Sequence, residues 1–466
     1  MGVSKADLVF VKSATVTDTN ANGGRKSYSA IANRQKFNLF PRVTRPERMA
    51  GITRYRKEFL WNKNASLETA FSVLAYMLLP SPAGDRFYLA AGTQSDAQGD
   101  IDASYQWAGG GALNSAITAG AQAVSIMFKN NDYAIDNAKT LVINSHFLTG
   151  QTIDAGVKAF DAVYYDGSKW IAQSAPNSDA EDVYPYGTYL GSNKVFSYNS
   201  NGNIEYLITQ NNSYTNEILY AGNGSQTVFT GQTTDHTPVK ANTASVKYTI
   251  GGQNYTATDN GSGAITGTSI SSGTINYESG AVAVTLSAAP DNSTNITIDY
   301  TERCYSWSGN VATIKTVEQL ANNYATANTY CGVAITLGDI KTSVSNKAIT
   351  GSGAFDETKI VLDNIGTVDD TWTLTFTSAT AFNCVGTLEG SVGTGAINSA
   401  FTPTNANTGQ KYLQIPANAW SGTWATGNTL QIKTGPAAAT LWLKEVVPAG
   451  TGAFSENGTL MEIYVE

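Results

Sequence analysis

Two histidines and three cysteines are the side chains of this 466-residue chain best suited to act as bases, nucleophiles or metal ligands. His146 and His236 are too few to build a histidine-based metal site. Cys304, Cys331 and Cys384 lack the close spacing of a metal knuckle or a redox pair, so we expect buried free thiols. We therefore predict no metal and no other cofactor.

Carboxylates are the remaining candidates for catalysis. The sequence has no Gly-x-Ser-x-Gly nucleophile elbow, no phosphate-binding Gly-x4-Gly-Lys-Ser/Thr loop and no His-Glu-x-x-His motif. A glycosidase needs only two acids close in space, so the sequence alone leaves that class open. However, it shows no repeat of about 20 to 30 residues, which would mark a long β-helical hydrolase. We predict no enzymatic activity.

Basic side chains are concentrated near the N-terminus. Residues 1–63 carry 13 Lys or Arg and 4 Asp or Glu, a balance of +9, whereas the remainder carries −17. Such a segment binds nucleic acid, docks on an acidic neighbouring subunit, or is simply a solvated surface. We favour docking, because the rest of the chain is acidic and the segment lacks a helix-turn-helix or zinc-finger pattern. The candidate docking residues are Arg25, Arg42, Arg45, Arg48, Arg54, Arg56 and Lys57.

Trp420 and Trp424 are the candidate aromatic contacts. They lie four residues apart in a glycine-rich segment, where exposed rings would be able to bind a sugar. A tryptophan in a strand belongs more often to a core than to a ligand platform, and this second interpretation stays open.

The composition indicates which elements must position these side chains. Charged residues make up only 14% of the chain, glycines number 44, and aromatic and β-branched residues recur throughout. This is typical of many short strands and tight turns, so we predict a mainly β fold with one or two short helices. The length predicts three or four domains. The longest apolar run, Phe71–Pro80, is too short to span a bilayer, and residues 1–16 lack the apolar core of a secretory signal.

The clearest domain signal lies between Ile218 and Tyr300. Val246, Tyr248 and Ile250 alternate with polar residues, and the runs 282–286 and 296–299 show the same period of two. Alternation of this kind places one strand face in a core and the other in water. Turn residues such as Gly251-Gly252 separate the runs, and about seven short strands at this spacing predict a two-sheet sandwich.

This region resembles a small immunoglobulin-like module of tailed-bacteriophage virion proteins. The resemblance rests on LYAGNGSQTVFTG, on VKYTIGGQNYTATDNGSGAITG and on GTINYESGAVAVTLSAAP followed by NITIDY, within residues 219–300. The segment WSGTWATGNTLQIKTGPAAATLWLKEVVPAG, residues 420–450, also resembles modules of such proteins. RYRKEFLWNKNAS, residues 54–66, resembles the first strand of another phage sandwich, whose last strands are similar to residues 441–466. The resemblance implies a virion setting and several β-sandwich modules.

Seven segments follow from these patterns. A capping box at Thr44 and Glu47 predicts a short helix that Gly51 closes, Leu67–Leu79 is interpreted as a strand, and a second capping box predicts a helix after Thr316. The segments are a basic N-terminal arm (1–53), a β-sandwich (54–145) that residues 440–466 would complete as a split domain, a β-rich hairpin segment (146–216) with a turn at Asp166-Gly167, an immunoglobulin-like sandwich (217–302), a linker with a short helix (303–349), a β-sandwich (350–447) and a C-terminal strand (448–466).

The expected function is assembly rather than chemistry. The resemblance implies a non-enzymatic structural component of a tailed-phage virion, in the tail, neck or baseplate, made in the host cytoplasm. Capsid decoration and a receptor- or carbohydrate-binding tail fibre or spike are the alternatives. The expected partners are other copies of the chain, in a homo-oligomer, and other virion proteins. We expect no membrane and no nucleic acid, and a host surface glycan only if the fibre alternative holds.

Overall fold

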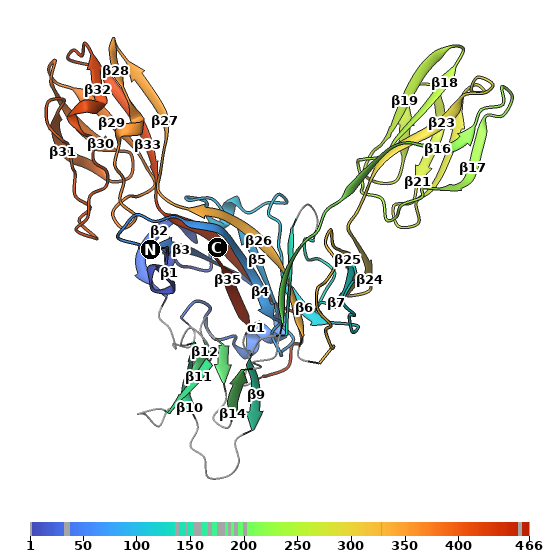
Figure 1. The fold of residues 1–466 in the computed structure, drawn as a ribbon, viewed down its shortest axis with the longest axis horizontal. Coiled ribbons are helices and arrows are strands. Elements are labelled where there is room, and N and C mark those ends of the chain that lie inside the picture. Colours follow the sequence, from blue (N-terminus) through green and yellow to red (C-terminus); the bar gives the residue numbers. More distant parts are fainter. Residues whose placement is uncertain are drawn as a thin grey trace. The chain divides into compact units, whose positions relative to one another are not determined.

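The protein is mainly β, as the composition predicts, and its strands form several antiparallel sheets. The structure is a computed structural model (Figure 1). By contacts the chain divides into two compact units: Met1–Gly109, Leu148–Tyr198 and Ala334–Glu466 form the first, and Gly110–Phe147 and Asn199–Val333 the second. The structure describes residues 2–31, 38–135, 139–145, 148–152, 160–165, 170–174, 182–184, 188–190, 194–198, 203–327, 329–454 and 459–465.

The first unit is built around a five-stranded sheet with the order β2-β1-β3-β34-β5. β3 pairs with β34 from Ile52–Val447 to Trp61–Ala438, which joins the two segments that the split-domain hypothesis linked. The prediction of an extended arm over residues 1–53 is wrong where β1 and β2 form: these two strands extend the sheet, and Val9 and Val11 pack in a cluster with Phe59 and Trp61 of β3. The strands are β1 (Leu8–Thr15), β2 (Gly23–Ala30), β3 (Ile52–Asn62), β5 (Arg86–Ala91) and β34 (Ala438–Val447).

A second sheet of the first unit packs on one face of the first. Leu60 of β3 shares a buried cluster with Val73 of β4 and Ile340 of β26. The interpretation of Leu67–Leu79 as a strand is confirmed from Ala70 onward, and so is the capped helix α1, in which Glu47 N donates to Thr44 and Thr44 N to Glu47. These elements are α1 (Arg45–Ala50), β4 (Ala70–Leu79), β26 (Tyr330–Ile340) and β35 (Leu460–Tyr464).

The C-terminal module, residues Ser343–Gly435, is inserted into the first unit between β26 and β34. Its sheet has the order β27-β33-β29-β30-β31, and β28 pairs with β32. Trp372, Leu374, Phe376 and Phe382 fill a core of its own. The strands are β27 (Ser343–Thr350), β28 (Gly353–Phe355), β29 (Asp370–Phe376), β30 (Ala381–Gly386), β31 (Gly390–Ala396), β32 (Trp420–Gly422) and β33 (Thr429–Gly435).

The described residues between Leu148 and Tyr198, which belong to the first unit, form three short strand pairs. β10 and β11 form the predicted hairpin, although its Asp166-Gly167 turn lies outside the described residues, as does His146. β12 pairs with β13, and β9 with β14. The strands are β9 (Leu148–Thr152), β10 (Phe160–Tyr165), β11 (Trp170–Ser174), β12 (Asp182–Tyr184), β13 (Thr188–Leu190) and β14 (Lys194–Tyr198).

The second unit contains the first residues of β26, Tyr330–Val333, in a sheet with the order β15-β8-β26-β6-β7-β25-β24. The helix predicted after Thr316 is wrong: the described residues from Thr316 to Ala327 form a loop. Glu205 of β15 accepts hydrogen bonds from the backbone N–H groups of Ala321 and Asn322, so groups that a helix would have to satisfy are bonded to a neighbouring strand. The strands are β6 (Gly110–Leu113), β7 (Ala123–Met127), β8 (Thr140–Asn144), β15 (Ile204–Ile208), β24 (Tyr305–Ser308) and β25 (Val311–Lys315).

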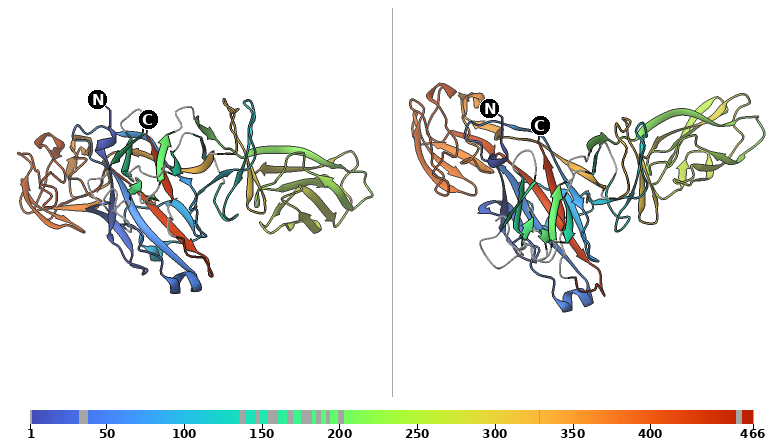
Figure 2. Two further views of the ribbon diagram at one scale, coloured as in Figure 1. Left: turned by 90° about the horizontal axis from the view of Figure 1, so that it is seen from below. Right: turned by 60° about the horizontal axis from the view of Figure 1, so that its bottom comes forward.

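The inserted sandwich, Asn212–Glu302, is the second part of this unit (Figures 1 and 2). A five-stranded sheet, β16-β23-β18-β19-β20, faces a three-stranded sheet, β17-β22-β21. The alternating residues Val246, Val284 and Ile298 lie in its core, as their spacing predicts. The strands are β16 (Asn212–Ala221), β17 (Val228–Thr233), β18 (Ser245–Ile250), β19 (Gln253–Asp259), β20 (Ile265–Gly267), β21 (Ile270–Ile275), β22 (Ala281–Leu286) and β23 (Asn295–Glu302).

Candidate functional site

The three predicted docking residues on β3 are buried and paired within the chain. Arg54 forms an ion pair with Glu445, directly opposite on β34, with Nε 2.8 Å from Oε2. Burial raises the pKa of Glu445, and the Arg54 charge opposes that rise. Arg56 Nη1 lies 2.7 Å from Asp18 Oδ1, and its Nε donates to the Leu39 carbonyl at 2.9 Å. These arginines therefore hold the first sheet together and do not offer a free docking surface.

Lys57 is the centre of a second buried network on the opposite face of β3. Its Nζ lies 2.6 Å from Asp96 Oδ1 and donates to the carbonyls of Asp96 and Gly24. Asp96 also accepts a hydrogen bond from Trp442 Nε1 at 2.8 Å and another from the Tyr105 hydroxyl. Burial alone would raise the pKa of Asp96, but its bonds to Lys57, Tyr105 and Trp442 hold it below the ordinary value. The network fastens the loop around Asp96 to the sheet.

The other predicted docking residues divide into paired and exposed ones. Arg25 forms an ion pair with Glu389 of the C-terminal module, and Arg48 donates to the Thr451 carbonyl at 3.3 Å. Arg42 and Arg45 are exposed, and α1 buries none of its residues. Met49 at the end of α1 is 62% exposed. The free part of the predicted docking set is thus Arg42 and Arg45, beside an exposed apolar side chain.

The predicted aromatic contacts belong to a core. Trp424 is 2% exposed and stacks on Phe376 with ring centroids 4.3 Å apart. Trp420 is half-buried and packs edge-on against Phe355 at 4.7 Å. This corrects the interpretation of the pair as an exposed platform: the interpretation as core residues holds, because the apolar side chains of the C-terminal module enclose both rings.

The cysteines and acids of the described residues form no metal site. Cys304, Cys331 and Cys384 are buried and free, which confirms the sequence interpretation. Burial raises the pKa of Cys331 and Cys384, so neither is an activated thiolate. Within the part of the chain that the structure describes, no three His, Cys, Asp or Glu side chains gather as metal ligands, and no helix is long and apolar enough to cross a membrane.

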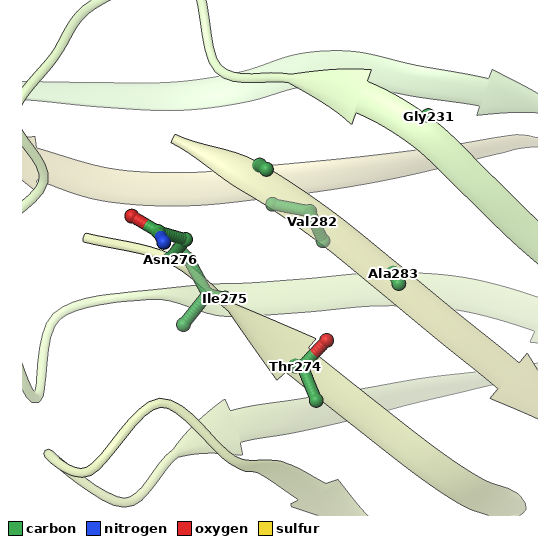
Figure 3. Close-up of a pocket in the computed structure, with 7 residues that line it drawn as sticks. Gly231, Thr274, Ile275, Asn276, Val282 and Ala283 are labelled. Carbon is green, nitrogen blue, oxygen red and sulfur yellow. The ribbon is translucent and has the colours of Figure 1, made fainter. Parts of the chain in front are cut away.

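One hollow lies on the inserted sandwich and is drawn in Figure 3. It has a volume of about 280 Å³ and is lined by Gly231 of β17, by Thr274 and Ile275 of β21 and by Val282 of β22. Asn276 and Thr274 supply its polar side chains. The lining contains no ionisable group, so the hollow is unsuited to general acid–base chemistry.

A second hollow, of about 240 Å³, lies between the first sheet and the C-terminal module. Its charged lining comprises Arg25 and Lys26 of β2 and Asp369 and Glu389 of the module. Glu389 is already bound to Arg25 and accepts a hydrogen bond from the Tyr412 hydroxyl at 2.8 Å. The Asp369 carboxylate lies 3.4 Å from Lys433 Nζ. Each carboxylate therefore has a cationic partner, which suits a structural contact better than proton transfer.

The sequence interpretation missed the internal partners Glu445, Asp96 and Glu389, and it did not single out Lys26. One signal was available on β3, where Arg54, Arg56 and Glu58 occupy one face and Lys57 the other. Charges on both faces of a strand inside a sheet require buried counterions. The partners themselves lie tens to hundreds of residues away, so only the fold identifies them.

Comparison with known proteins adds little. No protein-family model matches the chain, and no curated protein matches it. One solved structure, described as "The Triple Jelly Roll Fold and Turret Assembly in an Archaeal Virus", is 10% identical over 81% of this chain and 89% of that chain, with a TM-score of 0.07. A likeness this slight carries no argument about fold or function.

Proposed function

We propose that this chain is a non-enzymatic structural component of a tailed-bacteriophage virion and that it acts by assembly. The observation that carries the proposal is the inserted sandwich. The segments with the resemblance to virion immunoglobulin-like modules, residues 219–300, supply its strands, and their alternating side chains fill its core.

The buried ion pairs of the first sheet support the same function. The buried ionic groups Arg54, Glu445, Lys57 and Asp96 bind one another and join segments far apart in the sequence. A first sheet braced in this way is suited to be a stable part of a larger particle. We assign it to the tail, neck or baseplate, assembled in the host cytoplasm, with other copies of itself and other virion proteins as partners.

Docking is assigned to α1 and the residues just before it. Arg42 and Arg45 carry positive charge there, and Met49 adds apolar surface. Arginine pairs readily with carboxylates at interfaces, and methionine adapts its shape to a partner. An acidic surface of another subunit fits this combination, since the remainder of the chain has a balance of −17.

Locating the chain in purified particles tests the proposal. Antibody-gold labelling, followed by electron cryomicroscopy of the same particles, should place it at the tail, neck or baseplate in a fixed copy number. Uniform labelling over the capsid would instead indicate a decoration protein. Absence of the chain from purified particles, with the protein present in infected cells, would overturn the virion assignment.

A further inference from the structure

The C-terminal module is attached to the first sheet along a line of polar contacts, which we call the module seam. Trp61 Nε1 on β3 donates to the Asn364 carbonyl of the module at 2.7 Å. The Asn405 amide donates to the Tyr28 hydroxyl of β2 at 2.8 Å. The ion pair between Arg25 and Glu389 and the packing of Ile365 against the buried cluster that contains Trp61 also belong to the seam. The module has its own core, so these contacts determine how firmly it is held.

Lys26 lies in this seam without a hydrogen-bonding partner. The residue is 8% exposed, and its Nζ is fully enclosed and bonds to no acceptor. The Nζ lies 3.5 Å from the centroid of the Trp61 ring and 4.4 Å from that of Tyr28. An ammonium here has lost its water, and the two ring faces compensate only part of that loss.

The charged groups around Lys26 do not neutralise it. From the module, Glu389 is bound to Arg25, and Asp369 lies beside Lys433. From β2 itself come the cation Arg25 and the hydroxyl of Tyr28, whose pKa burial raises. Beyond the end of β3, Lys63 places its Nζ 5.0 Å from the Trp61 ring and adds a repelling positive charge. Burial first, and then Lys63, lower the pKa of Lys26 to about 7.

We propose that the module seam is a pH-dependent latch in which Lys26 is the titrating group: proton uptake by its amine opens the seam, and proton loss closes it. When the seam is open, water solvates the amine and its proton affinity returns to the ordinary value near 10.5. Opening is therefore coupled to the uptake of one proton between pH 10.5 and about 7. The open fraction rises about tenfold for each unit of pH lost in that window, and it levels off below it.

This latch is separate from the assembly role proposed above. It makes the mobility of the C-terminal module depend on protonation, whichever particle the chain belongs to. The two proposals fail independently, since the latch is tested on the isolated full-length chain.

Hydrogen exchange of the full-length protein tests the latch between pH 6.5 and 9.5, with rates corrected for the intrinsic effect of pH. The Trp61 indole N–H, whose hydrogen bond to the Asn364 carbonyl crosses the seam, should lose protection about tenfold per unit as the pH falls toward 7. Lys26→Met, which keeps the buried stem but cannot take up a proton, should show constant protection. The control Lys359→Met, at an exposed lysine of the same module, should follow the wild type. A pH-dependent Lys26→Met variant, or a wild type with constant protection, would overturn the proposal.

A second measurement needs no variant. In protein labelled with ¹³C-lysine, the ε-carbon signals report each amine as the pH changes. We expect the signal of the Lys26 amine to titrate near pH 7. If no lysine titrates near pH 7, the latch is excluded even where the Lys26→Met variant does not fold.

Discussion

Glu58 is a buried acid whose ionisation opposes folding. It shares a face of β3 with Leu60, is 3% exposed, and its Oε1 has no hydrogen-bonding partner. Burial raises its pKa from 4.5 to about 8. The folded chain therefore keeps this proton at pH values where the unfolded chain has lost it. It follows that the contribution of Glu58 to the free energy of unfolding falls as the pH rises from about 4.5 to about 8 and is level above that.

Replacing Glu58 with Gln should remove this loss of stability. At pH 9 we expect Glu58→Gln to exceed the wild type in free energy of unfolding by on the order of 3 kcal/mol, and near pH 5 the two should be similar. Urea denaturation at both pH values measures the difference. Glu68→Gln, at a half-buried acid in the same unit, is the control. Equal pH dependence in wild type and Glu58→Gln would contradict the assignment.

The Arg54–Glu445 pair should depend on both partners being present. Because each side chain is at most 4% exposed, removing one leaves the other charge buried without a partner. We expect Arg54→Met to lower the free energy of unfolding by about 3 to 5 kcal/mol. The double variant Arg54→Met with Glu445→Leu should recover most of that loss, because two apolar side chains need no counterion. A double variant as unstable as the single one would show that the pair itself is indispensable.

At the scale of elements, the inserted sandwich was predictable because its strands and turns are marked by residues that are neighbours in the sequence. Val246 and Tyr248 alternate with polar neighbours, and Gly251-Gly252 forms the turn to β19 with positive φ at both glycines. The helix expected after Thr316 shows the opposite case. Its capping box is a local pattern, but the Glu205 carboxylate on a distant strand binds the backbone of that segment instead. Local patterns predict elements well where no remote side chain competes for the same backbone groups.

The docking residues on β3 were mispredicted for a related reason. Arg54, Arg56 and Lys57 look like surface cations when only the sequence is known, since arginine and lysine are almost never fully buried unless they are paired. Their partners Glu445, Asp18 and Asp96 are brought close only by the folded sheet. Burial of charge depends on tertiary pairing, which a single sequence does not reveal.

The inserted sandwich should fold when it is separated from the chain. Its first and last strands pair at their ends, with Asn212 opposite Glu302, and its apolar residues form a closed cluster. We expect a fragment of residues 209–304 to give a cooperative thermal transition by circular dichroism. As a check, Val246→Ala in the fragment should destabilise it by about 1 to 3 kcal/mol, since it removes buried methyl groups. A fragment without a cooperative transition would show that the sandwich needs its neighbours.

At the scale of the whole molecule, the docking proposal now rests on two arginines. Deleting residues 1–53 would remove β1 and β2 from the first sheet, so that deletion tests folding rather than docking. The charge reversal Arg42→Glu with Arg45→Glu changes exposed side chains only. We expect it to reduce incorporation of the chain into particles at least tenfold, because repulsion replaces attraction at the acidic surface.

The control for this charge reversal is Lys341→Glu with Lys359→Glu, which changes the net charge equally at two other exposed positions. Quantitative mass spectrometry of purified particles measures incorporation for both variants, and thermal denaturation verifies that each is folded. Similar incorporation of both would remove the docking role from α1.

The pairing of β3 with β34 has a consequence for biosynthesis. β3 leaves the ribosome early, but the strand that occupies its second edge is translated nearly four hundred residues later. During that interval the inserted sandwich and the C-terminal module have all their own strands and can complete their cores. Until β34 is translated, this edge of β3 has no partner strand. It can therefore pair with other nascent chains. Yield in a recombinant host should therefore depend on translation speed and on chaperones that shield this early segment.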